Sequence, residues 1–245
     1  MNFLLVLAFL FFAGSLIGWV IELLWRRFFS ANNPERKWIN PGFLTGPYLP
    51  LYGFSLIILF TLSFIDVSFI KDEFFQKTVL FILMALCITF FEFIAGLIFI
   101  KGMKIKLWDY SNCHGNIMGI ICPKYTFFWW LLSGIYYFFI HPQILEWLFW
   151  FTNHKSFCFV VGFFYGVFSI DLIYSLNILT KLRKFASENK TIIHFTEFQK
   201  HIQAANAERK EKIYFWLSTK SEKIALKENL KKFYEKIENS KNKTE

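Results

Sequence analysis

Residues 79–100 read VLFILMALCITFFEFIAGLIFI, and this segment decides the class of fold because Glu92 is its only charged residue. A helix needs about 20 mainly apolar residues to cross a bilayer, so the segment predicts a transmembrane helix. The whole chain has this character: its 245 residues are 55% hydrophobic, 22% aromatic and 18% charged. Soluble domains contain about 25% charged residues. A soluble enzyme, a disulfide scaffold and a disordered chain are excluded, and an all-α, polytopic membrane helix bundle is predicted.

Five segments are apolar enough to predict transmembrane helices, although two of them are short. They are residues 3–24, 48–65, 79–100, 125–140 and 157–179. The apolar piece at 144–151 is too short to span and predicts an interfacial or re-entrant segment. Lysines and arginines concentrate in the loops that follow the first, third and fifth spans. By the positive-inside rule, this predicts a multi-pass protein of the cell membrane with its N-terminus outside and its C-terminus in the cytoplasm.

Residues 180–245 differ from the bundle at 1–179 and predict a cytoplasmic tail. The tail holds 16 of the 27 Lys+Arg and nine of the 18 Asp+Glu, so it carries +7 of the net charge of +9. It contains no glycine or proline, and its apolar residues recur at helical spacing, which predicts amphipathic helices with basic faces. These could lie on anionic lipid, pack on each other or dock to a partner protein. Nucleic-acid binding is not expected, because the basic charge belongs to this tail.

Two loops repeat the same glycine and proline pattern at a fixed offset of 73 residues. Gly42 matches Gly115, Gly46 matches Gly119, Pro50 matches Pro123, and Tyr52 matches Tyr125. The first loop also contains Pro47. Each loop follows a span with one glutamate and precedes an aromatic-rich span, which predicts two parallel helix–loop–helix repeats plus a fifth span. The loops either lie buried at membrane depth or are ordinary cytoplasmic turns in which proline starts the next helix.

Three carboxylates lie inside apolar segments: Glu22, Glu92 and Asp171. A charge at the bilayer centre costs about 2.5–3.5 kcal/mol on insertion scales, and less near an interface. Together they predict a polar interior that binds protons, cations or substrate. The structural alternatives are an i,i+4 ion pair between Glu22 and Arg26 and a helix-packing hydrogen bond from Asp171 to a Ser, Thr or Tyr. Glu92 has no local cation, which makes it the best functional candidate.

The second loop adds further candidate ligands for substrate or ion. Trp108 and Tyr110 could instead anchor the loop at the membrane interface, and Asp109 could cap a turn. Asn116 is the fourth polar or aromatic candidate in this loop. The loop cysteines lack the second ligand pair that a zinc site needs, so neither a metal nor a cofactor is expected.

These motifs together resemble the putative ABC-transporter type IV family, a group of bacterial membrane proteins also called CmpB-like permeases. The resemblance runs from about Phe11 to Pro142 and leaves the tail outside. It includes Gly18-Trp19 with Glu22, Gly42-Phe43-Leu44, Gly46-Pro47-Tyr48, Pro50, Tyr52-Gly53, Glu92, Trp108-Asp109-Tyr110-Ser111, Asn116, Gly119, Ile121-Cys122 and His141-Pro142. One departure is Ile120, where the family typically has a basic residue. If that cation pairs with a membrane carboxylate in the family, the pair is absent here.

The resemblance implies a permease subunit of unknown substrate and a separate ATPase subunit as a partner. The chain has no Gly-x-x-x-x-Gly-Lys-Ser/Thr phosphate loop, so we do not expect it to bind ATP itself. Two other functions fit the sequence: a membrane enzyme acting on lipid or envelope precursors through Glu22, Glu92, Asp109 and His114, and a scaffold acting through its basic tail. No nucleophile motif supports the enzyme, so transport is the leading hypothesis.

Overall fold

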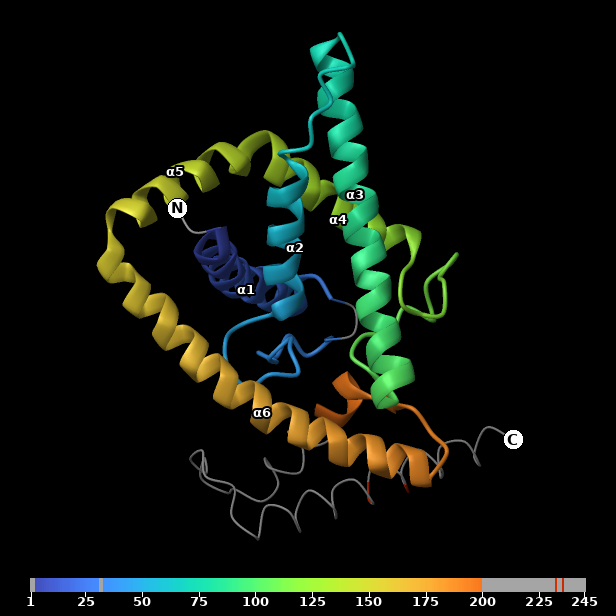
Figure 1. The fold of residues 1–245 in the computed structure, drawn as a ribbon. Helices are drawn as coiled ribbons and strands as arrows, with labels where there is room; N and C mark the ends of the chain where they lie inside the picture. The colour runs from blue at the N-terminus through green and yellow to red at the C-terminus, as the bar shows by residue number, and fades with distance from the viewer. Residues whose placement is uncertain (1–2, 31–32, 200–231, 233–234, 236–245) are drawn as a thin grey trace.

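The computed structural model describes residues 3–30, 33–199, 232 and 235, and within them the chain is mainly helical. Figure 1 shows the arrangement. The helices are α1 (Phe3–Phe28), α2 (Pro50–Leu62), α3 (Glu73–Leu97), α4 (Pro123–Ile135), α5 (His141–Asn153) and α6 (Cys158–Glu188). Shorter helical turns are η1 (Ile98–Met103), η2 (Tyr136–Ile140) and η3 (Lys155–Phe157), and two short strands are β1 (Ile105–Lys106) and β2 (Ile193–His194).

Three helices in this part of the chain are long and apolar enough to cross a membrane. They are Phe3–Phe28, Glu73–Met103 and Lys155–Glu188. They contain the first, third and fifth expected spans, so the prediction of a helical membrane protein is confirmed. The second expected span contains α2, which has 13 residues, and the fourth overlaps α4 and the η2 turn that continues it. At 1.5 Å per residue, α2 is about 20 Å long, which is less than the bilayer core, and the number of five spans stays a prediction.

Local sequence explains where these helices begin and end. Pro50 and Pro123 occupy the first turn of α2 and α4, where proline fixes φ and no backbone N–H is needed. The side chain of Asp72 caps α3 by accepting from the backbone N–H of Phe75. Both α1 and α6 continue beyond the apolar stretches into charged sequence, because hydrogen bonding along the backbone does not depend on hydropathy. α6 therefore extends to Glu188, inside the region expected to be tail.

Close contact between α1 and α2 depends on small residues. Gly14 lies against the backbone of Tyr52 and Gly53, and a Cβ added at Gly18 would collide with the Tyr52 side chain. Small residues four apart let two helix backbones approach each other in a membrane. In Figure 1, α1 is seen nearly along its axis, while α3 and α6 lie roughly in the plane of the page. α1 therefore crosses both of these helices steeply. The main apolar core lies between α1, α2, α3, α5 and α6.

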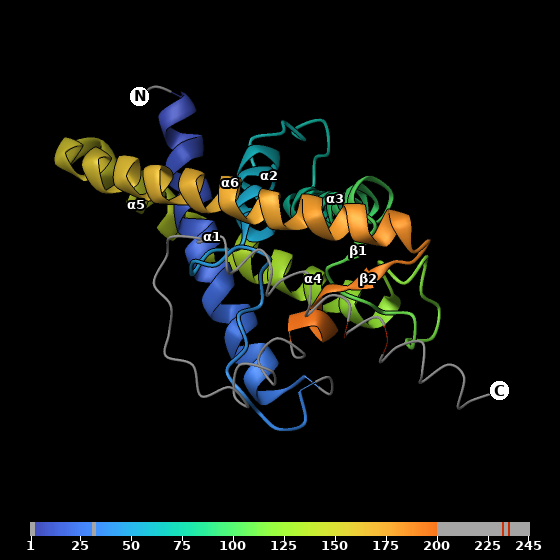
Figure 2. The ribbon, with the colours of Figure 1, turned by 90° about the horizontal axis from the view of Figure 1, so that it is seen from below.

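The chain after α6 returns to the second loop. Ile193 pairs with Ile105, and His194 with Lys106, in a parallel register. Figure 2 shows this segment folding back beneath α6 beside β1 and α4. Ile105, Ile193 and Phe198 are buried in a second apolar core with the last turns of α6. The beginning of the tail is thus packed against the loops, whereas the amphipathic helices predicted farther along lie mostly outside the described residues.

Candidate functional site

Glu22 on α1 forms an ion pair with Arg26, one turn further along the helix. The Nε of Arg26 donates to Oε1 of Glu22 at 2.9 Å. The Oε2 of Glu22 accepts from the hydroxyl of Tyr52 on α2 at 3.1 Å. The ion pair that the spacing predicts is therefore present, and Tyr52 adds a donor from another helix. Both oxygens have partners, which offsets the cost of a carboxylate in an apolar segment.

Glu92 on α3 is held differently. It is 3% exposed, and its Oε1 accepts a long hydrogen bond of 3.4 Å from the Tyr110 hydroxyl in the second loop. Its Oε2 is buried and has no partner in hydrogen-bonding geometry. Trp129 on α4 is the second neutral donor beside the carboxyl group. Buried polar atoms are ordinarily hydrogen-bonded, so the unpaired Oε2 makes Glu92 a candidate for binding a further group.

Both glutamates belong to one group of side chains, here called the carboxylate cluster. It consists of Glu22, Arg26, Tyr52, Glu92 and Tyr110. Glu22 lies near enough to Glu92 for an electrostatic interaction, and both carboxylates act on the two tyrosines. Burial, together with the nearby carboxylates, raises the pKa of Tyr110 well above its ordinary value of 10.0. Its phenol therefore stays protonated and can donate to Glu92 at neutral pH.

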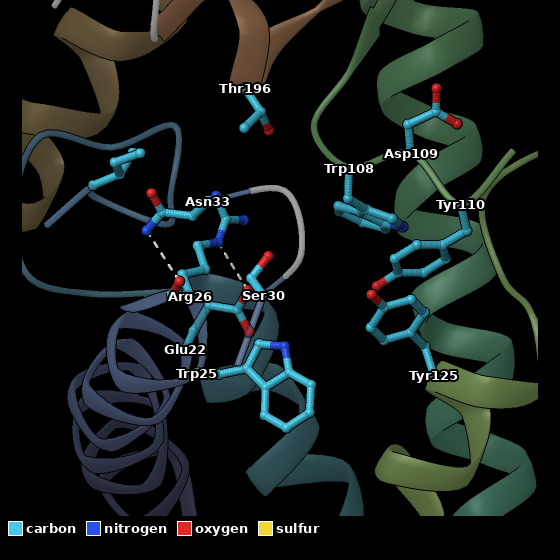
Figure 3. A pocket seen from close by; sticks show the side chains of 11 residues that line it. Glu22, Trp25, Arg26, Ser30, Asn33, Trp108, Asp109, Tyr110, Tyr125 and Thr196 are labelled. Carbon is cyan, nitrogen blue, oxygen red and sulfur yellow. Dashed lines mark hydrogen bonds and ion pairs between the residues drawn. The ribbon is translucent and has the colours of Figure 1, made fainter. Parts of the chain in front are cut away.

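A polar pocket of about 90 Å³ opens beside the carboxylate cluster. Figure 3 shows Glu22 and Arg26 on one side of it and the rings of Tyr110 and Tyr125 on the other. The two tyrosine rings stack with their centroids 4.1 Å apart. Thr196, which follows β2, also lines the pocket. The return of the chain after α6 therefore covers part of this site.

A second cavity of about 430 Å³ is apolar and lies between α1, α2, α4 and α5. Tyr52 and Trp129 both line it, with ring centroids 5.1 Å apart. The Tyr52 ring thus contacts the apolar cavity while its hydroxyl binds Glu22, which lines the polar pocket. The carboxylate cluster therefore stands at the junction of a polar pocket and an apolar cavity. Such a junction can hold an amphipathic molecule or control the passage of a small one.

Asp109 organises the second loop. Its Oδ1 accepts from Lys106 at 2.8 Å and from the hydroxyl of Ser111 at 2.5 Å, and its Oδ2 lies 3.2 Å from Nδ1 of His194. Burial opposes the charge of Asp109, but the hydrogen bonds from Lys106 and Ser111 prevail and lower its pKa below the ordinary 3.8. The nearby Gly119 has φ +67°, and a Cβ there would meet these same side chains. Glycine is therefore required at this turn.

The side chains of two other sequence candidates also form hydrogen bonds within the second loop. The indole N–H of Trp108 donates to the carbonyl of Ile120 at 2.9 Å. The Asn116 amide donates to the carbonyls of Ser111 and Cys113 and accepts from the backbone N–H of Gly119. Like Asp109, these side chains hold the loop in shape. Tyr110 is the candidate of this loop that reaches the carboxylate cluster.

Asp171 on α6 is surrounded by donors from the first loop. Its oxygens accept from the backbone N–H groups of Thr45 and Gly46 at 3.1 and 2.8 Å and from the Tyr48 hydroxyl at 2.6 Å. Ser175 completes the set at 3.0 Å. The carboxylate thus supplies acceptors for two backbone N–H groups of the first loop. Asp171 lies in this loop anchor and outside the carboxylate cluster.

The first loop is also tied to the middle of α1. The backbone N–H of Leu49 donates to the carbonyl of Ser15 at 2.9 Å. Pro47 lies between Gly46 and Tyr48, two of the residues that bind Asp171. Gln199 beyond β2 donates to the carbonyl of Gly42 at 3.2 Å, so the return segment contacts this loop as well. The loop is therefore tied to α1, α6 and the return segment, while Thr45 and Pro47 remain exposed.

Sequence reasoning did not identify Tyr52 and Trp129 as members of the site. Tyr52 was expected only as part of a loop pattern, and Trp129 was one of many aromatic residues in an apolar segment. His194 and Thr196 were also missed, because they lie in the basic tail. For Tyr52 the sequence showed only its place in the first turn of a helix, two residues after Pro50, and its contact with Glu22 was visible in the structure alone.

Comparisons with known proteins place this geometry in a family. No curated protein and no solved structure matches the chain. A family model described as Putative ABC-transporter type IV matches residues 9–176. The match covers more than half of the chain and includes the carboxylate cluster, both loops and Asp171. With three helices suited to a membrane, the chain is a membrane protein that belongs to the putative ABC-transporter type IV family.

Proposed function

We propose that the protein is a transporter-like permease subunit of the cell membrane, with the carboxylate cluster as its transport site. The observation that carries the proposal is Glu92, a 3% exposed carboxylate with one unpaired oxygen, at the junction of a polar pocket and an apolar cavity. Ionisable groups inside a membrane protein ordinarily mark substrate or ion pathways. The family match supports the same function.

The proposed architecture has five spans, with the N-terminus outside and the tail in the cytoplasm. Two parallel helix–loop–helix repeats would form the transport site at their interface, as in other transporters. Supporting this, α2 and α4 both begin with proline, have 13 residues and are offset by 73 residues. The partner that we propose is a separate ATPase subunit, with the tail available for docking to it or to anionic lipid.

Transport can be tested before the substrate is known. Purified protein is reconstituted into liposomes, which are incubated in an extract of the source cells, and their contents are identified by mass spectrometry. We expect wild-type liposomes to accumulate at least one solute that empty liposomes exclude. Glu92→Gln should abolish this accumulation, because it removes the titratable oxygen but keeps the side-chain size. The same experiment, repeated with ATP and any ATPase that co-purifies with the protein, tests the proposal that the chain works with a separate ATPase subunit.

A matched control separates transport from folding. Glu73→Gln makes the same chemical change on the same helix α3, where Glu73 is exposed and pairs only with Lys77. This variant should accumulate the solute like the wild type. If Glu92→Gln also accumulates it while inserting normally, the carboxylate cluster is not the transport site.

A further inference from the structure

The surroundings of Glu92 contain neutral donors and one other carboxylate. Tyr110 from the second loop and Trp129 from α4 face it, and Tyr52 on α2 and Glu22 on α1 interact with it electrostatically. Arg26 is the cation of the cluster, and its Nε is already bound to Glu22. None of the ion pairs in the described part of the chain includes Glu92.

An apolar side chain closes the site on the α3 side. Ile120 is 1% exposed, and its side chain lies against Gly96, where an added Cβ would collide with it. Gly96 is four residues after Glu92, so both lie on one face of α3. Ile120 therefore packs against the face of α3 that carries Glu92 and brings no charge to it.

An ionised Glu92 is costly in this environment. Insertion scales put an acidic side chain in the membrane interior at about 2.5–3.5 kcal/mol, and here Glu22 adds a second negative charge nearby. Binding a cation or a proton removes that cost. A metal cation needs several oxygen acceptors around it, whereas the indole of Trp129 is only a donor and Tyr110 donates its proton toward Glu92. The arrangement therefore suits a proton better than a metal ion.

We propose that Glu92 is a proton-binding site and that the transport cycle is coupled to its protonation. A proton from water forms an O–H bond at Oε2, the oxygen that has no partner, and returns to water when that bond breaks; no electron or further reactant is involved. Tyr110 connects the site to water, because it lines the polar pocket and contacts Glu92. The coupling, but not the proton binding, rests on the proposed transport function.

Infrared spectroscopy of the full chain in lipid tests the proton binding directly. Spectra are recorded across a pH titration, and the band followed is the carbonyl stretch of a protonated carboxylic acid. Ordinary aspartates and glutamates ionise at about pH 4, so the diagnostic band in the wild type is one that persists above about pH 5.5 and disappears reversibly at higher pH. Glu92→Gln should lose this band, whereas Glu73→Gln, the exposed control on the same helix, should keep it. The proposal is overturned if the Glu92→Gln spectra retain the band.

Two further variants keep the test independent of folding defects. Glu92→Asp retains a carboxyl group, so its band should shift but persist. Ile120→Lys places an ammonium group near Glu92, and the band should disappear because the carboxylate is then paired. An unchanged band in Ile120→Lys, with normal secondary structure by circular dichroism, would contradict the placement of Glu92. If sodium chloride at fixed pH removes the wild-type band, the site binds a metal cation and the proposal fails.

The outcomes for proton binding and for transport are separable. A titrating Glu92 band without any solute accumulation supports the proton site and counts against the transport function. Accumulation that persists in Glu92→Gln, together with a titrating wild-type band, keeps the proton site but rejects its coupling to transport.

Discussion

Three carboxylates lie in apolar helices, and the charge of each is compensated in a different way. Glu22 is balanced by Arg26 and a tyrosine hydroxyl. Asp171 is balanced by backbone N–H groups and two hydroxyls. Glu92 has one long hydrogen bond and one unpaired oxygen. The incomplete pairing sets Glu92 apart from the other two carboxylates, and it is the observation on which the proposed function rests.

At this scale we predict that Asp171→Asn destabilises the protein. Asparagine keeps one acceptor oxygen, but its NH₂ group replaces the other oxygen. This NH₂ group then faces groups that are themselves donors, so those hydrogen bonds are lost. Hydrogen bonds to charged groups contribute about 1.5–3 kcal/mol each, so we expect a loss of about 3 kcal/mol or more. The free energy of unfolding is measured in detergent by denaturant titration.

Asp72→Asn is the matched control for this change. Asp72 caps α3, and asparagine caps a helix about as well as aspartate does, so the stability should stay within about 0.5 kcal/mol of wild type. Equal stability of Asp171→Asn and wild type would show that the first loop does not depend on this anchor.

At the scale of elements, the long helices were predictable and the partners of the loops were not. Hydropathy locates α1, α3 and α6 because a bilayer imposes a length and an apolar composition, and Pro50 and Pro123 mark the starts of α2 and α4. The bond between Gly46 and Asp171 joins residues 125 positions apart, and nothing in a local pattern specifies such a pair. The pairing of β2 with β1 was missed for the same reason.

The contact between the second loop and the return segment should depend on pH through Asp109. Its pKa in the folded protein is below the unfolded value of 3.8, because Lys106 and Ser111 donate to it against the effect of burial. Its stabilising contribution is therefore complete above pH 3.8 and is lost as the pH falls through the lowered pKa. The denaturant midpoint of the wild type should fall in this acid range, and Asp109→Asn should show a smaller fall.

His194→Ala provides the comparison for this prediction. It removes the imidazole that lies beside Oδ2 but leaves the donors on Oδ1. The acid dependence should then persist in His194→Ala while β2 is weakened. An acid dependence identical in wild type and Asp109→Asn would exclude Asp109 as its source.

At the scale of the whole molecule, the return segment after α6 links the two loops, and we propose that all three face the cytoplasm. Gln199 contacts the first loop and Ile193 pairs with the second, so a single segment bridges both halves of the chain. Thr196, between them, lines the polar pocket. An ATPase or anionic lipid that binds the following tail would therefore act on a segment that lines the polar pocket.

That argument requires the loop after α3 to be cytoplasmic and the loop after α2 to be outside, which we predict from the positive-inside rule. Ser68 and His114 are exposed residues in these two loops. In a variant with the four native cysteines replaced by serine, Ser68→Cys should react with an impermeant maleimide in intact cells. His114→Cys should react only after permeabilisation. Reaction of both in intact cells would place both loops outside, and the polar pocket would then open away from any cytoplasmic ATPase.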